Sequence, residues 1–329
     1  MIRQDETHMS FDLILPFLRP IEQLLLDDEV TEIMGNPDST WWFERDGALE
    51  QADVCFAAEG LRTGLEVVAN KLGKKLNEDS PLLHAQLPDG SRLAAVIPPV
   101  VRPAPAVVIR KFSSRKFTVE DLINRGTLTR DMAEYLSEQV EVGKTILISG
   151  GTGTGKTTLL NILAHSIPNH QRIVTIEDTA ELNIQKPNVV ATECQTDTHK
   201  ARVSFDDLLK GSLRWRPDRI ILGEVRGEEA RTLLDSFNTG HSGSLATIHA
   251  NSATKALRRF ANLVMRSHQQ ARIEDIEAEI SEAVDLVIHV ERQPCRRAVR
   301  EVVRLTGYDR RLQQFVCEPV FPACNEVAA

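Results

Sequence analysis

The segment that most constrains this chain is "GGTGTGKTT", which occupies residues 150–158. It matches the pattern G-x-x-x-x-G-K-S/T, with glycines at Gly150 and Gly155, followed by Lys156 and Thr157. The apolar run "KTILISG" predicts a strand before it, and "GKTTLLNILAHSI" predicts a helix after it. In that setting glycines let backbone N–H groups turn toward phosphate oxygens, and the positive end of the helix dipole adds to the attraction. The segment therefore predicts a phosphate-binding loop.

Two side chains of this loop carry most of its expected chemistry. Lys156 would neutralise the β- and γ-phosphates of a nucleotide, and the hydroxyl of Thr157 would bind Mg²⁺. The predicted nucleotide-binding residues of the loop are Gly150, Gly151, Thr152, Gly153, Thr154, Gly155, Lys156, Thr157 and Thr158.

Strand and helix patterns alternate along the rest of the chain from residue 119 onward. Alternation of this kind is typical of a parallel sheet flanked by helices, so we expect an α/β domain. Two of the predicted helices have start signals, because Thr118 and Ser204 precede segments with acids in the first turn. The alternating segments are "KTILISG", "GKTTLLNILAHSI", "RIVTIED", "SFDDLLKGSLRW", "RIILG", "GEEARTLLDSFNTG" and "SLATIH".

The first third of the chain has a different pattern, which predicts a smaller α+β domain. "VTEIMGN", "STWWFERDGALEQ", "SRLAAVIPP" and "AVVIRKF" are predicted as strands, and leucines at helical spacing predict a helix over "AAEGLRTGLEVVANKLGKKL". The short polar segment "SSRKFT" would join the two domains. The predicted boundaries are an amino-terminal domain at 1–112, a linker at 113–118 and a phosphate-loop domain at 119–329.

Acidic residues end two of the predicted strands. Glu177 and Asp178 follow "RIVTI", and Glu224 follows "RIILG", where Gly223 stands in the place that an aspartate often fills. Carboxyl ends of parallel strands meet at one edge of a sheet, so both acidic segments should face the phosphates. A carboxylate there can position magnesium or polarise the attacking water. A lone acid at a strand end is as often a solvated charge, but two beside a phosphate loop favour function.

Two histidines flank the last predicted strand of this series. His241 precedes "SLATIH" and His249 ends it. One of them could lie near the γ-phosphate, while a hydrogen bond to a backbone carbonyl is the ordinary alternative. Metal binding is disfavoured because no third ligand of matching spacing is nearby.

Bulk properties narrow the class of protein further. The formal charge of −8 disfavours binding to nucleic acid through overall electrostatics. Five cysteines without a C-x-x-C pair favour a reducing compartment over a disulfide framework or a zinc site. The start of the sequence does not resemble a signal peptide, and no run approaches the ~20 apolar residues of a membrane span. We expect a cytosolic protein, or one attached to a membrane only through partners.

Four segments in this order resemble the secretion-superfamily ATPases, the PilT- and GspE-like motors of type II and type IV secretion and of pili. They are the phosphate loop, "TIEDTAE", "ILGEVRG" and "GHSGSLATIHAN". In that family they are called Walker A, the Asp box, Walker B and the His box. The resemblance covers nearly the whole chain, and "VTEIMGNPDSTWWFERDG", "LPDGSRLAAVIPP", "VVIRKF" and "TVEDLINRGTLTRDMAEYL" are most similar to the conjugative-transfer subgroup called TrbB.

The resemblance implies roles for individual residues. It implies that Glu224 activates water and that Glu177 and Asp178 support Mg²⁺ and water, with Asp178 and Thr157 as the metal ligands. It implies that His249 senses the γ-phosphate, with His241 accompanying it. Arg92 and Arg110 match basic residues by which the amino-terminal domain closes on the nucleotide, although a surface salt bridge is the ordinary alternative for each. The Asp box lacks the proline usual in pilus members, which favours the conjugation branch and leaves the role of Glu181 open.

The resemblance also implies a fold and an assembly. The expected fold is a RecA-like P-loop ATPase domain preceded by the smaller α+β domain, and the expected ligands are ATP and Mg²⁺. The expected assembly is a homohexamer at the cytoplasmic side of the inner membrane, held there by secretion or conjugation components. Direct specific DNA binding is not expected, because the formal charge is −8 and only 5% of the residues are aromatic. The assembly would hydrolyse ATP to energise pilus assembly or substrate transfer in a conjugative type IV secretion system. The alternatives are a RecA-like nucleic-acid translocase and a nucleotide-gated scaffold that does not hydrolyse ATP.

Overall fold

The computed structural model describes residues 15–45, 47–87, 89–112, 117–195, 202–267, 271–293 and 296–321. The chain divides into two compact units, Met1–Lys116 and Phe117–Ala329. Most of the predicted linker, residues 113–116, lies outside the described residues. The two units are each built around a β-sheet with its own hydrophobic core.

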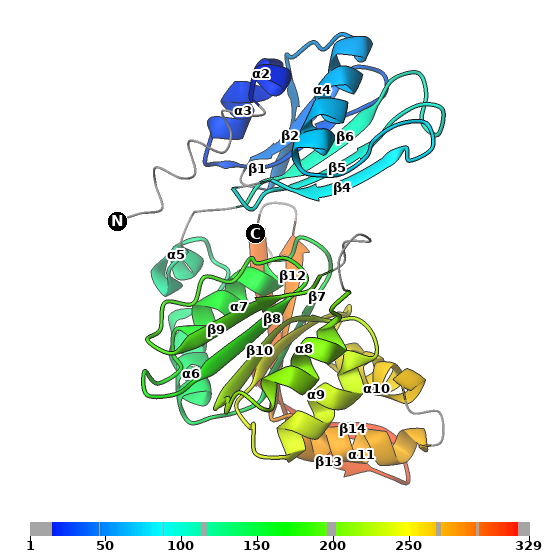
Figure 1. Cartoon of the computed structure of the whole chain (residues 1–329). Helices are drawn as coiled ribbons and strands as arrows, with labels where there is room; N and C mark the ends of the chain where they lie inside the picture. Colours follow the sequence, from blue (N-terminus) through cyan, green and yellow to red (C-terminus); the bar gives the residue numbers. More distant parts are fainter. Residues whose placement is uncertain are drawn as a thin grey trace. The chain divides into compact units, whose positions relative to one another are not determined.

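In the described part of the first unit, six strands form an antiparallel sheet in the order β3-β2-β1-β6-β5-β4 (Figure 1). The segment "STWWFERDGALEQ" forms two strands instead of one, because the chain turns near Gly47, whose φ of +83° favours glycine. Strand β4 was not predicted. The strands are β1 (Val30–Gly35), β2 (Trp41–Arg45), β3 (Ala48–Ala52), β4 (Leu82–Gln86), β5 (Arg92–Val96) and β6 (Ala106–Arg110).

Helix α4 (Ala58–Lys71) supplies the largest apolar helix face of this unit. Its leucines Leu61 and Leu65 are buried, as their helical spacing predicts, and pack in one core with Ile33 and Trp41 of the sheet. Shorter helical segments precede the sheet, and Leu18, Ile21 and Leu25 belong to the same core. These segments are α2 (Leu15–Leu18), the 3₁₀ turn η1 (Arg19–Ile21) and α3 (Glu22–Leu26).

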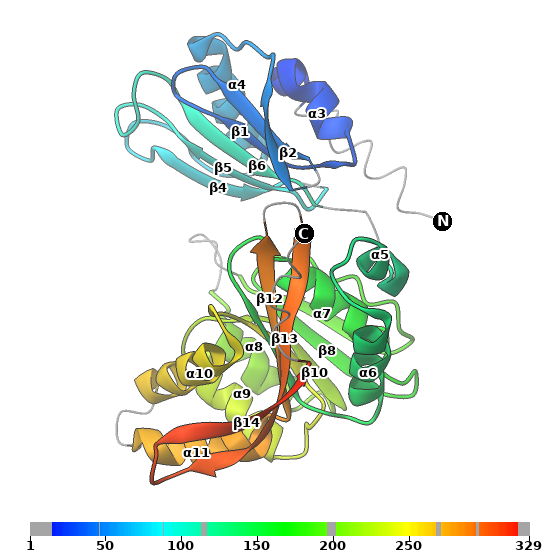
Figure 2. The same cartoon turned by 180° about the vertical axis from the view of Figure 1, so that it is seen from behind.

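The second unit has a mixed sheet in the order β14-β13-β12-β7-β11-β10-β8-β9. From β12 to β9 all neighbours run parallel, and the antiparallel strands β13 and β14 extend the sheet at its other edge (Figure 2). The strands are β7 (Ile146–Gly150), β8 (Ile173–Glu177), β9 (Val189–Glu193), β10 (Arg219–Val225), β11 (Leu245–His249), β12 (Leu286–Gln293), β13 (Arg296–Asp309) and β14 (Gln314–Phe321).

Two helices of the second unit begin at the caps that the sequence predicts. Thr118 and Ser204 each accept from the backbone N–H three residues later, and Asp121 and Asp207 accept in return, so both helix starts are capping boxes. No helix within the described ranges is long and apolar enough to cross a bilayer. The helices are α5 (Val119–Asn124), α6 (Arg130–Glu141), α7 (Lys156–Ala164), α8 (Phe205–Ser212), α9 (Glu229–Asn238), α10 (Ala253–Ser267) and α11 (Ile273–Ala283).

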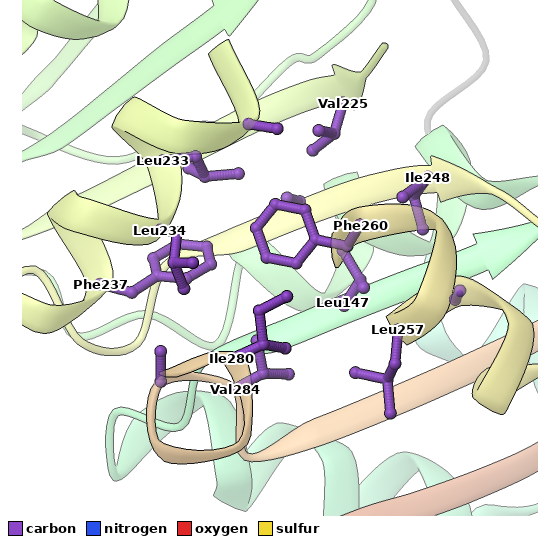
Figure 3. Packing of buried hydrophobic residues seen from close by; sticks show 14 of the residues in the cluster. Leu147, Val225, Leu233, Leu234, Phe237, Ile248, Leu257, Phe260, Ile280 and Val284 are labelled. Atoms are coloured by element: carbon purple, nitrogen blue, oxygen red, sulfur yellow. The ribbon is translucent and has the colours of Figure 1, made fainter. Parts of the chain in front are cut away.

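Both faces of the parallel sheet are buried, which explains its continuous apolar runs. Along β7, Leu147 packs into a core with α8, α9, α10 and α11, where Phe260 lies at the centre (Figure 3). Its neighbours Ile146 and Ile148 point to the other face and pack with α5, α6 and α7. The layers helix, parallel sheet and helix confirm the predicted α/β class of this part of the chain.

Candidate active site

The phosphate loop connects the end of β7 to the start of α7. Gly153 and Gly155 have φ of +69° and +90°, a region that side chains other than glycine rarely adopt. Gly150 is required for a different reason, since a Cβ there would lie 2.5 Å from the carbonyl oxygen of Val290 on β12. The glycine pattern therefore reflects both loop conformation and the close approach of a neighbouring strand.

The side chains of the loop are already ordered. Lys156 is 7% exposed, and its Nζ donates to the carbonyl oxygen of Gly151 over 2.6 Å. Thr154 Oγ1 donates to the same carbonyl over 3.0 Å. Thr157 and Thr158 lie half-buried in the first turn of α7. The ammonium group of Lys156 therefore lies on the concave side of the loop, where phosphate groups bind in loops of this type.

The sheet order brings the predicted acids and one histidine to the edge that carries the phosphate loop. Strands β7, β11, β10 and β8 are neighbours and all parallel. His249 pairs in register with Gly150, so the end of β11 adjoins the start of the loop. Glu224 is the residue before the last of β10, and Glu177 is the last residue of β8. Their shared edge is the usual location of ligands in parallel α/β sheets.

Glu224 is held from two sides. Its Oε1 lies 3.2 Å from Nε2 of His249, and its Oε2 accepts from Arg226 over 2.8 Å. The other guanidinium nitrogen of Arg226 donates to Oδ2 of Asp178 over 2.7 Å. Glu224 has 15% of its side chain exposed and Asp178 has 30%. Arg226 therefore joins Glu224 to Asp178, and His249 joins this network through Glu224.

The charge state of His249 follows from its surroundings. Burial lowers its pKa first, and the nearby charges of Lys156, Arg226 and Arg259 lower it further, while Glu224 opposes them. The ring is therefore neutral at pH 7. With its proton on Nε2, it donates to the Glu224 carboxylate.

Glu177 lies in a different environment from Glu224. It is 3% exposed, and its Oε1 accepts from the backbone N–H groups of Glu181 and Leu182 over 3.0 and 2.9 Å. Burial raises its pKa to about 7, against the lowering effect of those two hydrogen bonds. Glu181 thus contributes its backbone N–H to this contact. Through these two hydrogen bonds, the Glu177 carboxylate stabilises the loop that follows β8.

Gly223 explains how β10 fits against β8 at this point. A Cβ at Gly223 would lie 3.3 Å from Cγ of Glu177. The carbonyl oxygen of Gly223 accepts a hydrogen bond from Thr247 Oγ1 over 2.5 Å. An aspartate at position 223 would therefore crowd the side chain of Glu177. The first accessible acid on β10 comes one residue later, at Glu224.

The structure does not place His241 with the other candidates. His241 precedes the start of β11, whereas His249 is its last residue, so the two histidines lie near opposite ends of this strand. Its Nδ1 lies 3.3 Å from the carbonyl oxygen of Ser236 at the end of α9. This contact corresponds to the ordinary alternative, a histidine satisfied by a backbone carbonyl.

Arg92 and Arg110 belong to the first unit and are register partners on β5 and β6. Directly paired residues of an antiparallel sheet point to the same face, so the two guanidinium groups share a face. Arg110 also pairs in register with Glu32 on β1, and it is exposed, while Arg92 is half-buried. Their contact with a nucleotide remains a prediction.

Several residues near the phosphate loop and the acids were missed by sequence reasoning. Arg226 stands inside the Walker B segment, two residues after Glu224, so its proximity could have been inferred. Glu229 caps the next turn by accepting from the N–H groups of Arg226 and Gly227 over 2.5 and 2.8 Å. Arg297 donates from Nε to the carbonyl oxygen of Gly153 over 2.9 Å. It comes from β13, and nothing in its local sequence indicates this contact.

A magnesium ion would find oxygen donors here. Among the described residues, no group of three His, Cys, Asp or Glu side chains forms a closed metal site. Mg²⁺ bound with a nucleotide needs only one or two protein oxygens, because phosphates and water complete its shell. The Thr157 hydroxyl on α7 and the part-exposed Asp178 carboxylate provide donors of this kind. The donor types therefore fit the ion.

Comparisons with known proteins agree with this geometry. A family model described as "Type II/IV secretion system protein" matches residues 18–327. The chain is 38% identical over 288 residues to "Probable conjugal transfer protein TrbB" of Sinorhizobium fredii, covering 86% of this chain and 85% of that protein. It is 32% identical over 330 residues to "Type IV secretion system protein VirB11" of Bartonella quintana, covering 88% and 92%.

A solved structure shows the same fold at lower sequence identity. The "X-ray structure of the Legionella pneumophila ATPase DotB" has 20% identity and a TM-score of 0.60, with 90% of this chain and 81% of that chain covered. This likeness confirms the expected fold, a smaller amino-terminal α+β domain followed by a RecA-like P-loop ATPase domain.

Proposed function

The chain belongs to the family of type II/IV secretion system proteins, and from this we propose that it is an ATP-hydrolysing homohexameric motor of a conjugative type IV secretion system. Its work would be to energise pilus assembly or substrate transfer. Similarity to a relative named for conjugal transfer supports the conjugative role. The proposal includes a cytoplasmic position at the inner membrane, reached through other components of the machine.

One observation carries the proposal of hydrolysis. Glu224 lies at the carboxyl edge of the strand two places from the phosphate-loop strand, with its carboxylate oriented by His249 and Arg226. A carboxylate held in this way can accept a proton from a water that attacks the γ-phosphate. The buried Glu177, which is engaged with two backbone N–H groups, is less suited to that task.

The remaining residues would divide the other tasks of the reaction. Lys156 would exchange its bond to the Gly151 carbonyl for the β- and γ-phosphate oxygens of ATP. Thr157 and Asp178 would hold Mg²⁺, and the bound ion would neutralise charge on those phosphates. His249 would respond to the γ-phosphate through its contact with Glu224. Arg92 and Arg110 would close the first unit on the nucleotide, so that phosphate loss releases it.

The proposal predicts that Lys156→Ala abolishes nucleotide binding without unfolding the protein. Binding of ATP–Mg to the full chain would be measured by isothermal titration, with Arg214→Gln, an exposed arginine far along the chain from the loop, as the control. Light scattering with and without ATP would report the assembly, beside an assay of phosphate release. A monomer without turnover under all conditions would refute the ring-motor proposal.

Two alternatives have distinct outcomes in the same set of measurements. A nucleotide-gated scaffold would bind ATP while phosphate release stays at background. A nucleic-acid translocase would bind DNA tightly, with an affinity that falls steeply as salt rises. The proposed motor requires phosphate release that depends on Glu224 and on nucleotide binding, without such DNA binding.

A further inference from the structure

Helix α10 presents a basic face that the proposed reaction does not use. Its other side is buried in the core through residues such as Leu257, Phe260 and Val264. The exposed side follows the i, i+3, i+4 spacing of a single helix face. Its exposed polar and charged residues are Lys255, Arg258, Arg259, Asn262 and Arg266.

This basic face forms one wall of a cavity of ≈ 470 Å³ that reaches the nucleotide site. The cavity is also lined by Gly151 of the phosphate loop and by His249 at the end of β11. The charge of Arg259 acts on His249 and helps to lower its pKa, which places this arginine close to the hydrolysis residues. The cations of α10 and the phosphate loop therefore border the same open space.

The positive charges of this wall lack negative partners in the described part of the chain. Within those residues, Lys255, Arg258, Arg259 and Arg266 make no salt bridge and no side-chain hydrogen bond, although many other arginines of the chain do. Like charges on one helix face repel each other, and an anion between them relieves the repulsion. The chain as a whole carries a formal charge of −8, so this concentration of cations is a local feature.

We propose that the cavity between the phosphate loop and α10 is an anion subsite that receives inorganic phosphate when it leaves the nucleotide site. This inference rests on the proposed function, because hydrolysis supplies the phosphate. The subsite would draw the doubly charged product away from Lys156 and hold it at Arg258 and Arg259 until it diffuses out. Free phosphate fits better than a nucleic acid, because the described lining has no Phe, Tyr or Trp side chain on which bases could stack.

The experiment measures phosphate binding to the full chain saturated with ADP and Mg²⁺. Sodium phosphate is the titrant, with sodium chloride at matched ionic strength as the reference, since exposed charges are screened by salt. In the double variant Arg258→Gln/Arg259→Gln, the Kd for phosphate should rise by roughly tenfold, because each exposed charged contact contributes a factor of about five or less. The Kd for ADP should change by less than about twofold.

Two controls keep the test decisive. Arg214→Gln removes an exposed arginine from another part of the unit and should leave the phosphate Kd unchanged. Lys255→Gln/Arg266→Gln neutralises the other cations of the wall and should also weaken phosphate binding. All substituted side chains are exposed, so the variants should fold, and circular dichroism would verify this.

Several outcomes would overturn the proposal. It is wrong if the wild-type protein does not bind phosphate, or if both double variants bind it as tightly as the wild type. It is also wrong if a single-stranded oligonucleotide binds the wild type and loses affinity in these variants while phosphate does not bind. Because the titration needs no ATP turnover, a protein that hydrolyses ATP without binding phosphate here would refute only the subsite. A protein that binds phosphate without turnover would refute only the motor.

Discussion

Glu177 and Glu224 lie at the carboxyl ends of two neighbouring parallel strands, yet their surroundings differ. Glu177 at the end of β8 is buried and accepts two backbone N–H groups, and its pKa is raised to about 7. Glu224 on β10 remains partly exposed and lies between the ring of His249 and the guanidinium of Arg226. The two glutamates therefore differ in burial and in partners, and the different roles proposed for them rest on that difference.

The difference arises from packing between the two strands. Gly223 lets β10 approach Glu177 closely, since a Cβ at this position would lie 3.3 Å from Cγ of Glu177. The acid on β10 stands one residue later, at Glu224, where it reaches His249. A buried carboxylate whose oxygen already accepts two backbone N–H groups is poorly placed to accept a proton from water. A carboxylate that water can reach is better placed to do so.

The largest effect is expected from Glu224→Gln. The amide keeps the shape of the side chain but cannot accept a proton, so kcat for ATP hydrolysis should fall about 10²- to 10⁴-fold while ATP affinity is retained. Steady-state phosphate release and nucleotide titration would measure both. The paired variant Glu177→Gln should lose far less activity at pH 7. If the two variants lose activity in the reverse order, the assignment of Glu224 as the base is wrong.

The next effect concerns stability and depends on pH. The pKa of Glu177 is raised from 4.5 to about 7, so the folded state binds a proton more tightly than the unfolded state does. Its contribution to the free energy of unfolding is fully present below pH 4.5 and is lost as pH rises through 7. The loss is on the order of 3 kcal/mol, since each pKa unit corresponds to about 1.4 kcal/mol.

Denaturant unfolding at several pH values, in EDTA to exclude magnesium, would measure this loss. Glu177→Gln is the matched control, because its amide oxygen can still accept both backbone N–H groups but carries no titrating proton. The free energy difference between the variant and the wild type should grow between pH 4.5 and 7 and then level off. A difference that stays constant across that range would show that Glu177 is not buried as described.

A smaller effect is expected from Arg226→Ala. This change removes the cation that joins Glu224 to Asp178 but leaves His249 in contact with the base. Because half of the arginine side chain is exposed, the lost interactions should reduce kcat only about five- to tenfold. Arg226→Lys should recover part of the loss through its charge. A loss as large as that of Glu224→Gln would mean that the arginine itself takes part in the chemistry.

Sequence reasoning predicted the central part of the fold well, because local signals determine it. The strand and helix around the phosphate loop, the strands ending at Glu177 and His249, and the capped helix after Ser204 are found within three residues of their predicted places. Strand β4 and the division of "STWWFERDGALEQ" were not predicted. They depend on a turn near Gly47 and on antiparallel pairing along a sheet edge, and neither leaves a strong periodic pattern.

The sequence by itself determined the phosphate loop, the α/β class and the candidate residues at the strand ends, because each depends on short patterns of glycine, apolar and acidic residues. Only the tertiary structure distinguished the surroundings of these candidates, on which their proposed tasks rest. Glu177 differs from Glu224 in its burial and its backbone hydrogen bonds. The two histidines differ because they lie at opposite ends of β11, and only His249 contacts Glu224. The contact of Arg297 with Gly153 joins residues 144 positions apart. Contacts of that kind follow from strand order and side-chain packing, which no local pattern encodes.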